Sequence, residues 1–175
     1  MKPSYRFKIL LLGDPAVGKT SLINKFVQER FEVDYKATIG VDIMSKTVYV
    51  DGFEIKLSLW DIAGQDKFRF FRNVFYRGAS GAILVFDLTR LSTFTNLDNW
   101  VKELNEYIKG KIPLIIIGNK LDLTSMRVVK TLDAKGFAEK LSSSYLETSA
   151  KTGLGVNESF TTISKMIFKK PYSTP

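Results

Sequence analysis

The stretch Gly13-Asp14-Pro15-Ala16-Val17-Gly18-Lys19-Thr20 decides the fold class of this 175-residue chain. It matches G-x-x-x-x-G-K-[ST], a pattern in which the backbone N–H groups of a glycine-containing loop surround phosphate oxygens. The apolar run Phe7-Lys8-Ile9-Leu10-Leu11-Leu12 before it is typical of a buried strand, and the apolar positions of residues 22–27 after it recur at helical spacing. A strand, a phosphate loop and a helix in this order predict a site for a di- or triphosphate.

The residues of this loop have separate predicted tasks. The Lys19 ammonium is expected to reach the β and γ oxygens, and the Thr20 hydroxyl to ligate Mg²⁺. Pro15 has no N–H to offer, but the N–H groups from Ala16 to Thr20 remain, so we expect nucleotide binding to survive. The predicted phosphate-binding set is Gly13, Asp14, Pro15, Ala16, Val17, Gly18, Lys19, Thr20 and Ser21.

Two residue types are missing from the chain, which contains no cysteine and no histidine. Without cysteine there is no disulfide, thiolate nucleophile, zinc-thiolate site or lipidation cysteine within it. Without histidine there is no Ser-His-Asp triad and no imidazole acid or base. The remaining catalytic means are carboxylates, amides, hydroxyls, lysine, arginine, or a hard cation held by oxygen ligands.

The length and the charge place the chain among single globular domains, here spanning 1–175. No apolar run approaches the roughly 18 residues of a membrane span, and we expect a cytoplasmic protein, peripheral on a membrane surface at most. With 26 Lys and Arg against 18 Asp and Glu, 26 − 18 gives +8. The basic residues are scattered singly, so solvated surface is favoured over a nucleic-acid or membrane-binding patch.

Strand-like and helix-like segments alternate along most of the chain. Gly81 to Phe86 and Leu114 to Ile117 are typical of buried strands, which indicates an α/β fold with a mostly parallel sheet covered on both faces. Met44 to Val50 and Glu54 to Trp60, joined by Asp51-Gly52, predict a hairpin and hence one antiparallel edge strand.

One helix-like stretch lies between the two later strands. Its apolar residues recur at helical spacing and form one stripe: Phe94, Leu97, Val101, Leu104 and Ile108. Three charged residues lie off this stripe: Lys102, Glu103 and Glu106.

The second hairpin strand leads into residues suited to the phosphate end of such a site. Asp61 follows the strand as the acidic partner of a Mg²⁺ site, with binding through a water expected. Gly64 lacks a side chain, so its N–H can approach a γ-phosphate closely. Gln65 can accept one hydrogen bond from a water and donate another, which aligns that water for in-line attack.

Two later segments predict selection of guanine. After one strand comes Asn119-Lys120-Leu121-Asp122, and after another comes Thr148-Ser149-Ala150-Lys151. The Asp122 carboxylate can accept from guanine N1–H and N2, and the Ala150 N–H can donate to O6; adenine matches neither. The Lys120 stem can cover the base and Asn119 can tie the two loops together.

Together these motifs resemble those of the small Ras-like GTPases, most closely the Rab branch. The resemblance covers nearly the whole chain and implies a P-loop NTPase fold, the Ras-like G domain, with a six-stranded sheet and five helices on both faces. It implies a GTP-hydrolysing monomeric switch with slow intrinsic turnover, GTP or GDP and Mg²⁺ as cofactors, and a place in membrane traffic. The segments that carry it are GDPAVGKT (13–20), ATIGVDI (37–43), WDIAGQ (60–65), FYRGA (75–79), FDLT (86–89), NKLD (119–122) and TSAK (148–151).

The resemblance also assigns residues that their chemistry alone does not. Thr38 matches the threonine that ligates Mg²⁺ and senses the γ-phosphate, Phe31 the aromatic against the guanine, and Tyr35 the tyrosine that closes over the phosphates. The resemblance implies two switch segments, around residues 31–43 and 61–77, with an exchange factor, a GTPase-activating protein and effectors as their partners, and no specific nucleic acid.

Three departures from the Rab pattern are Pro15, Asp66 for Glu and Ile62 for Thr, which bear on hydrolysis rate and on regulator recognition. Three alternatives stay open: a GTP-binding scaffold with very weak hydrolysis, another P-loop ATPase or kinase, and a basic membrane- or nucleic-acid-binding module.

Overall fold

The computed structural model describes residues 4–32 and 36–170. Within them the strands form one sheet in the order β2-β3-β1-β4-β5-β6. Only the β2·β3 pair is antiparallel, so the expected six-stranded, mostly parallel sheet with one antiparallel edge strand is confirmed. The strands are β1 (Tyr5–Leu12), β2 (Val41–Val50), β3 (Phe53–Ile62), β4 (Gly81–Asp87), β5 (Leu114–Asn119) and β6 (Ser144–Glu147).

The helical segments of the described chain agree with the five expected helices. The helix expected over 94–108 is interrupted only at Asn96, whose φ of −75° and ψ of −7° stay in the right-handed region, so α3 and α4 are two parts of one helix. Across residues 4–32 and 36–170, no helix combines the length and apolarity that crossing a bilayer requires. The segments are α1 (Lys19–Gln28), α2 (Arg69–Tyr76), α3 (Leu91–Thr95), α4 (Leu97–Tyr107), α5 (Thr131–Lys140) and α6 (Val156–Lys169), with 3₁₀ turns η1 (Asp66–Phe68) and η2 (Thr124–Met126).

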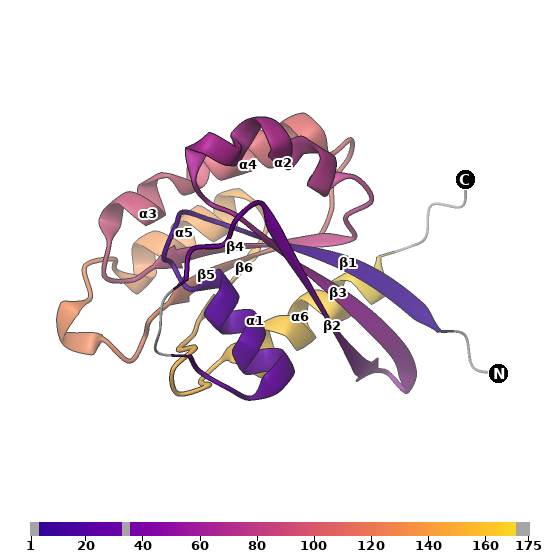
Figure 1. Ribbon diagram of the computed structural model, residues 1–175. Helices are drawn as coiled ribbons and strands as arrows, with labels where there is room; N and C mark the ends of the chain where they lie inside the picture. The colour runs from indigo at the N-terminus through magenta and orange to yellow at the C-terminus, as the bar shows by residue number, and fades with distance from the viewer. Residues whose placement is uncertain (1–3, 33–35, 171–175) are drawn as a thin grey trace.

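Alternate side chains of β1 enter two separate hydrophobic cores. Phe7, Ile9 and Leu11 pack with buried residues of α1 and α6, whereas Leu10 and Leu12 pack with those of α2, α4 and α5. Figure 1 shows α2 and α4 on one side of the sheet and α1 and α6 on the other. Because both faces are covered, the central strands are apolar on both sides.

The turn between β2 and β3 follows from its sequence. Asp51 and Gly52 have φ values of 50° and 80°, as the two central residues of a type I′ hairpin turn require. The hairpin predicted from Asp51-Gly52 is therefore confirmed, with both strands reaching further than the sequence indicated: Val41 pairs with Ile62.

One side chain departs from the pattern expected of α4. Glu103 lies off the apolar stripe of the helix in sequence, yet it is only 5% exposed. The reason is an ion pair with Arg72 of α2.

Candidate nucleotide-binding site

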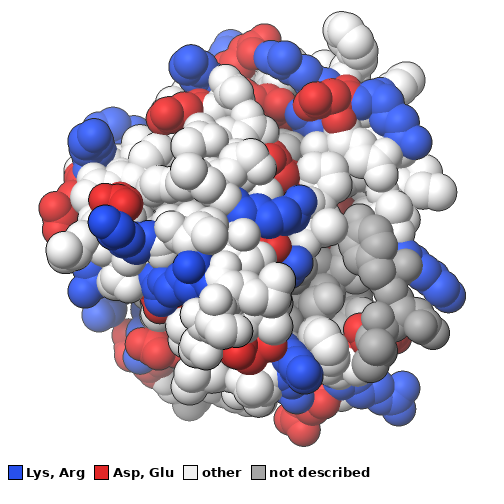
Figure 2. Space-filling model, turned by 90° about the vertical axis from the view of Figure 1, so that its left-hand side faces the viewer, with Lys and Arg blue, Asp and Glu red and all other residues white. Residues whose placement is uncertain are grey.

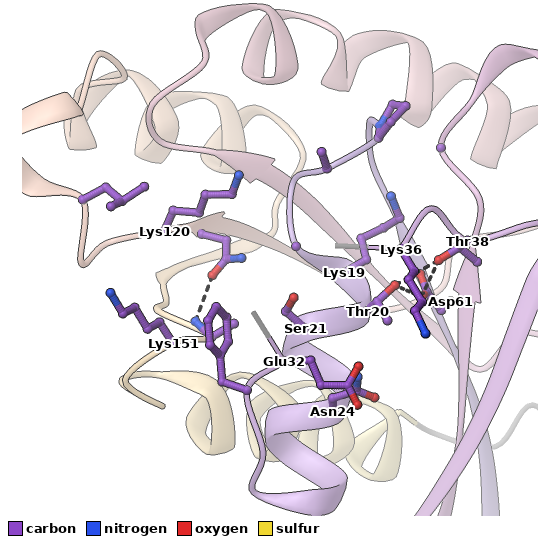
Figure 3. A pocket seen from close by; sticks show the side chains of 18 of the residues that line it. Lys19, Thr20, Ser21, Asn24, Glu32, Lys36, Thr38, Asp61, Lys120 and Lys151 are labelled. Atoms are coloured by element: carbon purple, nitrogen blue, oxygen red, sulfur yellow. Dashed lines mark hydrogen bonds between the residues drawn. The ribbon is translucent and has the colours of Figure 1, made fainter. Parts of the chain in front are cut away.

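A cavity of about 470 Å³ lies at the carboxyl ends of the parallel strands, where ligands of such sheets bind. The loops after β1, β3, β5 and β6 and the start of α1 surround it. Lys19, Thr20, Thr38 and Asp61 lie at one end of the cavity, and Lys120 and Lys151 at the other (Figure 3). The volume falls within the range of roughly 300–1,000 Å³ that is usual for small-molecule sites.

Most of the predicted site residues line this cavity. Gly13, Asp14, Val17 and Ser149 are not among its lining residues and contact those that are, whereas Tyr35 falls outside the described residues. The predicted residues that line it are Pro15, Ala16, Gly18, Lys19, Thr20, Ser21, Phe31, Thr38, Asp61, Gly64, Gln65, Asn119, Lys120, Asp122, Ala150 and Lys151.

The phosphate loop is shaped by left-handed backbone and by a partner far along the chain. Ala16 has a φ of 62° and Gly18 a φ of 102°. A Cβ on Gly18 would lie 2.2 Å from Nδ2 of Asn119, and this amide donates to the carbonyl oxygen of Val17 at 3.0 Å. Gly18 is thus required for conformation and for space. Asn119 joins its own loop to the phosphate loop, a contact that the sequence did not predict.

Lys19 is folded back along the inside of the phosphate loop. Its Nζ donates to the carbonyl oxygens of Gly13 at 2.7 Å and Asp14 at 3.0 Å. Burial disfavours the charged ammonium and lowers the pKa of Lys19 to about 8, although the carboxylates of Asp61 and Asp14 act in the opposite direction. Lys19 therefore lies buried beneath the loop that phosphate oxygens would enter.

Three oxygen-bearing side chains from distant parts of the chain meet beside Lys19. Thr20 Oγ1 lies 3.0 Å from Thr38 Oγ1, and both hydroxyls donate to Asp61 Oδ2. Asp61 Oδ1 is buried and has no hydrogen-bond partner among the described residues, and burial raises the pKa of this carboxyl. Hard oxygen ligands with an unsatisfied buried carboxylate oxygen fit a Mg²⁺ ion.

Gly64 packs directly against the phosphate loop. A Cβ added there would lie 2.3 Å from the carbonyl oxygen of Gly13 and 2.7 Å from the nitrogen of Pro15. No side chain fits in that space, so Gly64 brings the loop after β3 into contact with the loop after β1. Gln65, the next residue, lines the cavity.

The opposite end of the cavity holds a network of side chains around Asp122. Ser149 Oγ donates to Asp122 Oδ1 at 2.7 Å, which orients the carboxylate. Asn119 Oδ1 accepts from Thr148 Oγ1 at 2.9 Å and from the N–H of Ala150 at 3.3 Å. The predicted guanine residues are thereby brought together from two loops.

A buried acid that the sequence analysis did not identify connects the two ends of the cavity. Asp87, which ends β4, is 1% exposed, and its Oδ2 accepts from Lys120 Nζ at 2.8 Å and Arg90 Nε at 3.1 Å. Arg90 Nη2 in turn donates to the carbonyl oxygen of Pro15 at 2.8 Å. Burial alone would raise the pKa of Asp87, but hydrogen bonds from Lys120 and Thr89 hold it below its usual value.

Further lining residues carry no recognisable sequence signal. Asn24 lies in α1, and the other three lie in loops, where such residues are ordinary. They are Asn24, Glu32, Lys36 and Leu123.

The charges on the face shown in Figure 2 are mixed. Lys and Arg side chains lie among Asp and Glu side chains with uncharged surface between them. On this face the excess of basic residues forms no continuous band of one sign, which does not favour a nucleic-acid groove there.

Comparison with known proteins agrees with this geometry. Residues 8–169 match the model of the Ras family. Ras-related protein RABA1f of Arabidopsis thaliana is 41% identical over 165 residues, 94% of this chain and 76% of that protein. RABA4b of the same plant is 44% identical over 167 residues, 95% and 75% of the two chains, and Rab11B of Nicotiana tabacum is 41% identical over 165 residues, 94% and 76%. The chain therefore belongs to the Ras family, and it is a small, Rab-like GTPase.

Proposed function

We propose that this GTPase is a switch in which Mg²⁺ and the γ-phosphate of GTP hold Thr38 and Gly64. The observation that carries the proposal is the convergence of Thr20, Thr38 and Asp61, which come from the helix after the phosphate loop, from the segment before β2 and from the end of β3. Because the same site holds both the segment around Thr38 and the segment around Gly64, loss of the γ-phosphate releases the two segments together.

At the phosphate end, Lys19 and the N–H groups of residues 16–20 bind the phosphate oxygens. Thr20, Thr38 and Asp61 would hold Mg²⁺, which neutralises charge that develops on the phosphoryl oxygens. Gln65 aligns the attacking water and needs no strong basicity to do so. Intrinsic hydrolysis is accordingly slow, and a partner's arginine would add about 10³- to 10⁵-fold.

At the other end, Asp122 accepts from the guanine N1–H and N2 groups, and Ser149 holds its carboxylate in place. The Ala150 N–H, whose present bond to Asn119 Oδ1 is long at 3.3 Å, would donate to O6 of the bound guanine, and the stems of Lys120 and Lys151 would cover the base. Phe31, which is 38% exposed and lines the cavity, would contact the same base.

The membrane role and the regulators are part of the same proposal. Rab-like relatives support a function in membrane traffic at a membrane surface, with an exchange factor, an activating protein and effectors binding the two switch segments. The apolar side chains exposed there suit protein partners: Ile39 is 80% exposed, Phe70 87% and Phe71 65%.

The experiment is chromatography of the nucleotide that copurifies with the protein, followed by single-turnover hydrolysis of preloaded GTP by the wild type and by Gln65→Leu. We expect guanine nucleotide in the wild type and at least a tenfold slower hydrolysis in the variant. Equal hydrolysis in both proteins at a rate clearly above background would contradict the role of Gln65. A wild type that shows no hydrolysis above background would favour the GTP-binding scaffold.

A further inference from the structure

An ion pair buried between α2 and α4 lies next to the loop that carries Gln65. Arg72 Nε and Nη2 donate to Glu103 Oε1 and Oε2, both at 2.7 Å. The two side chains are 3% and 5% exposed. Desolvating two charges is costly even when they pair this well, and apolar residues of similar volume often serve stability equally. The pair therefore calls for an explanation besides stability.

The remaining arm of the guanidinium reaches the segment that carries Gln65. Arg72 Nη1 donates to the carbonyl oxygens of Ala63 at 3.3 Å and Gln65 at 3.2 Å. These two carbonyls lie on either side of Gly64. Tyr76 Oη donates to Glu103 Oε1 at 2.8 Å, which fixes the carboxylate against which the guanidinium is held.

The same guanidinium is also linked to the phosphate loop. Its carbon lies 4.5 Å from the ring centre of Trp100, and Trp100 Nε1 donates to Asp14 Oδ1 at 2.8 Å. Asn96 Nδ2 donates to the same oxygen at 2.5 Å. One chain of contacts, buried at Arg72 and Trp100, thus runs from the backbone of Gln65 to Asp14.

We propose that Arg72 and Glu103 are positioning residues for GTP hydrolysis, which hold the backbone of Gln65 at a fixed place relative to the phosphate loop. The inference rests on the role proposed above for Gln65. A glutamine that orients water acts through geometry, and a misplacement of about 1 Å can cost 10²-fold in rate. Neither Arg72 nor Glu103 lines the cavity, so each acts through Gln65 rather than on the nucleotide.

The first test is single-turnover hydrolysis of preloaded GTP by Arg72→Met. We expect the rate to fall about 10- to 100-fold, while GDP dissociation stays within threefold, because the guanine end of the site is untouched. Arg72→Lys keeps the charge but lacks the fork of donors, and it should recover only a small part of the rate. An unchanged rate in Arg72→Met would overturn the proposal.

A second variant guards against misfolding, since Arg72→Met removes the buried cation that pairs with Glu103 and leaves its carboxylate only the Tyr76 hydroxyl and the exposed Arg69, at 4.0 Å. Arg72→Met/Glu103→Gln removes both charges and keeps a side-chain oxygen that accepts from the Tyr76 hydroxyl. We expect this variant to unfold near the wild-type temperature and still hydrolyse GTP about tenfold or more slowly. Wild-type hydrolysis in the folded double variant would refute the positioning role.

The Gln65→Leu background separates this inference from the function on which it rests. There, adding Arg72→Met should slow hydrolysis by less than twofold, because the group that is positioned is already gone. An equal slowing in both backgrounds would refute action through Gln65. If Gln65→Leu alone has no effect, the proposed function fails instead. Arg127→Met is the matched control, since it breaks another bidentate pair, with Glu147, and should leave hydrolysis within twofold.

Discussion

Gly64 is a position where one added carbon atom is enough to alter the site. Gly64→Ala places a Cβ 2.3 Å from the Gly13 carbonyl oxygen, so the loop after β3 must move away from the phosphate loop. We expect single-turnover GTP hydrolysis to fall about 10- to 100-fold, with GDP dissociation little changed.

The control for that substitution is Gly136→Ala in α5, where an added Cβ meets nothing within 4 Å. Alanine suits a helix better than glycine by roughly 1 kcal/mol. This control should hydrolyse GTP normally and unfold at a slightly higher temperature. Normal hydrolysis in Gly64→Ala would show that close approach at Gly64 is unnecessary.

Ser149 illustrates a residue that acts through its neighbour. Its hydroxyl holds Asp122 Oδ1 at 2.7 Å, and a hydrogen bond to a charged group contributes about 1.5–3 kcal/mol. Ser149→Ala should therefore speed GDP release about tenfold or more, measured with a fluorescent GDP analogue. Ser164→Ala removes another buried serine hydroxyl, bonded to Phe160 within α6, and should leave release unchanged. Equal release in the two variants would refute the orienting role.

At the scale of elements, a cluster of hydrogen bonds around Glu147 joins β6 to the start of α5. Glu147 accepts from Arg127, Tyr145 and Thr131. Burial alone would raise the pKa of Glu147, but these hydrogen bonds hold it below its usual 4.5. A depressed pKa means that the stabilisation is present above pH 4.5 and is lost as the pH falls through the folded-state pKa.

Glu147→Gln should therefore lower the unfolding temperature at pH 7. As the pH is lowered, the unfolding temperature of the variant should then decrease less than that of the wild type. The measurement is thermal unfolding of both proteins from pH 7 to pH 3, with the difference between them shrinking below pH 4.5. A difference that stays constant over this range would show that the Glu147 charge contributes nothing.

The elements and the motif residues were predictable because their signals are local. The strand runs, the Asp51-Gly52 turn and the G-x-x-x-x-G-K-T loop each occupy a few consecutive residues. Glu103 was expected off the apolar face of its helix, and nothing near it in sequence points to Arg72, which lies 31 residues away. Asp87 and Arg90 were likewise missed. They are close in sequence, but Lys120, which pairs with Asp87, and the Pro15 carbonyl, which accepts from Arg90, lie far from them along the chain and meet them only in the fold.

For the whole molecule, nucleotide should contribute strongly to stability. A ligand at 100 times its Kd adds about 2.7 kcal/mol to the free energy of unfolding, which for a chain of this size corresponds to roughly 5–10 °C. Nucleotide-free protein should gain this shift with GDP and Mg²⁺, and lose part of it with a chelator. The same concentration of ATP should give no shift. An equal shift with ATP would contradict guanine selection.

The hold of Asn119 on the phosphate loop has a consequence for protein synthesis. The loop is complete in the chain by Thr20, yet the amide that fixes Val17 is added about a hundred residues later, and Trp100 and Asn96, which hold Asp14, also follow much later. A nascent chain that ends before β5 contains the phosphate-binding sequence, Asn96 and Trp100, but it still lacks Asn119, which ends β5. The ribosome must therefore expose most of the sheet before the first GTP or GDP can be retained.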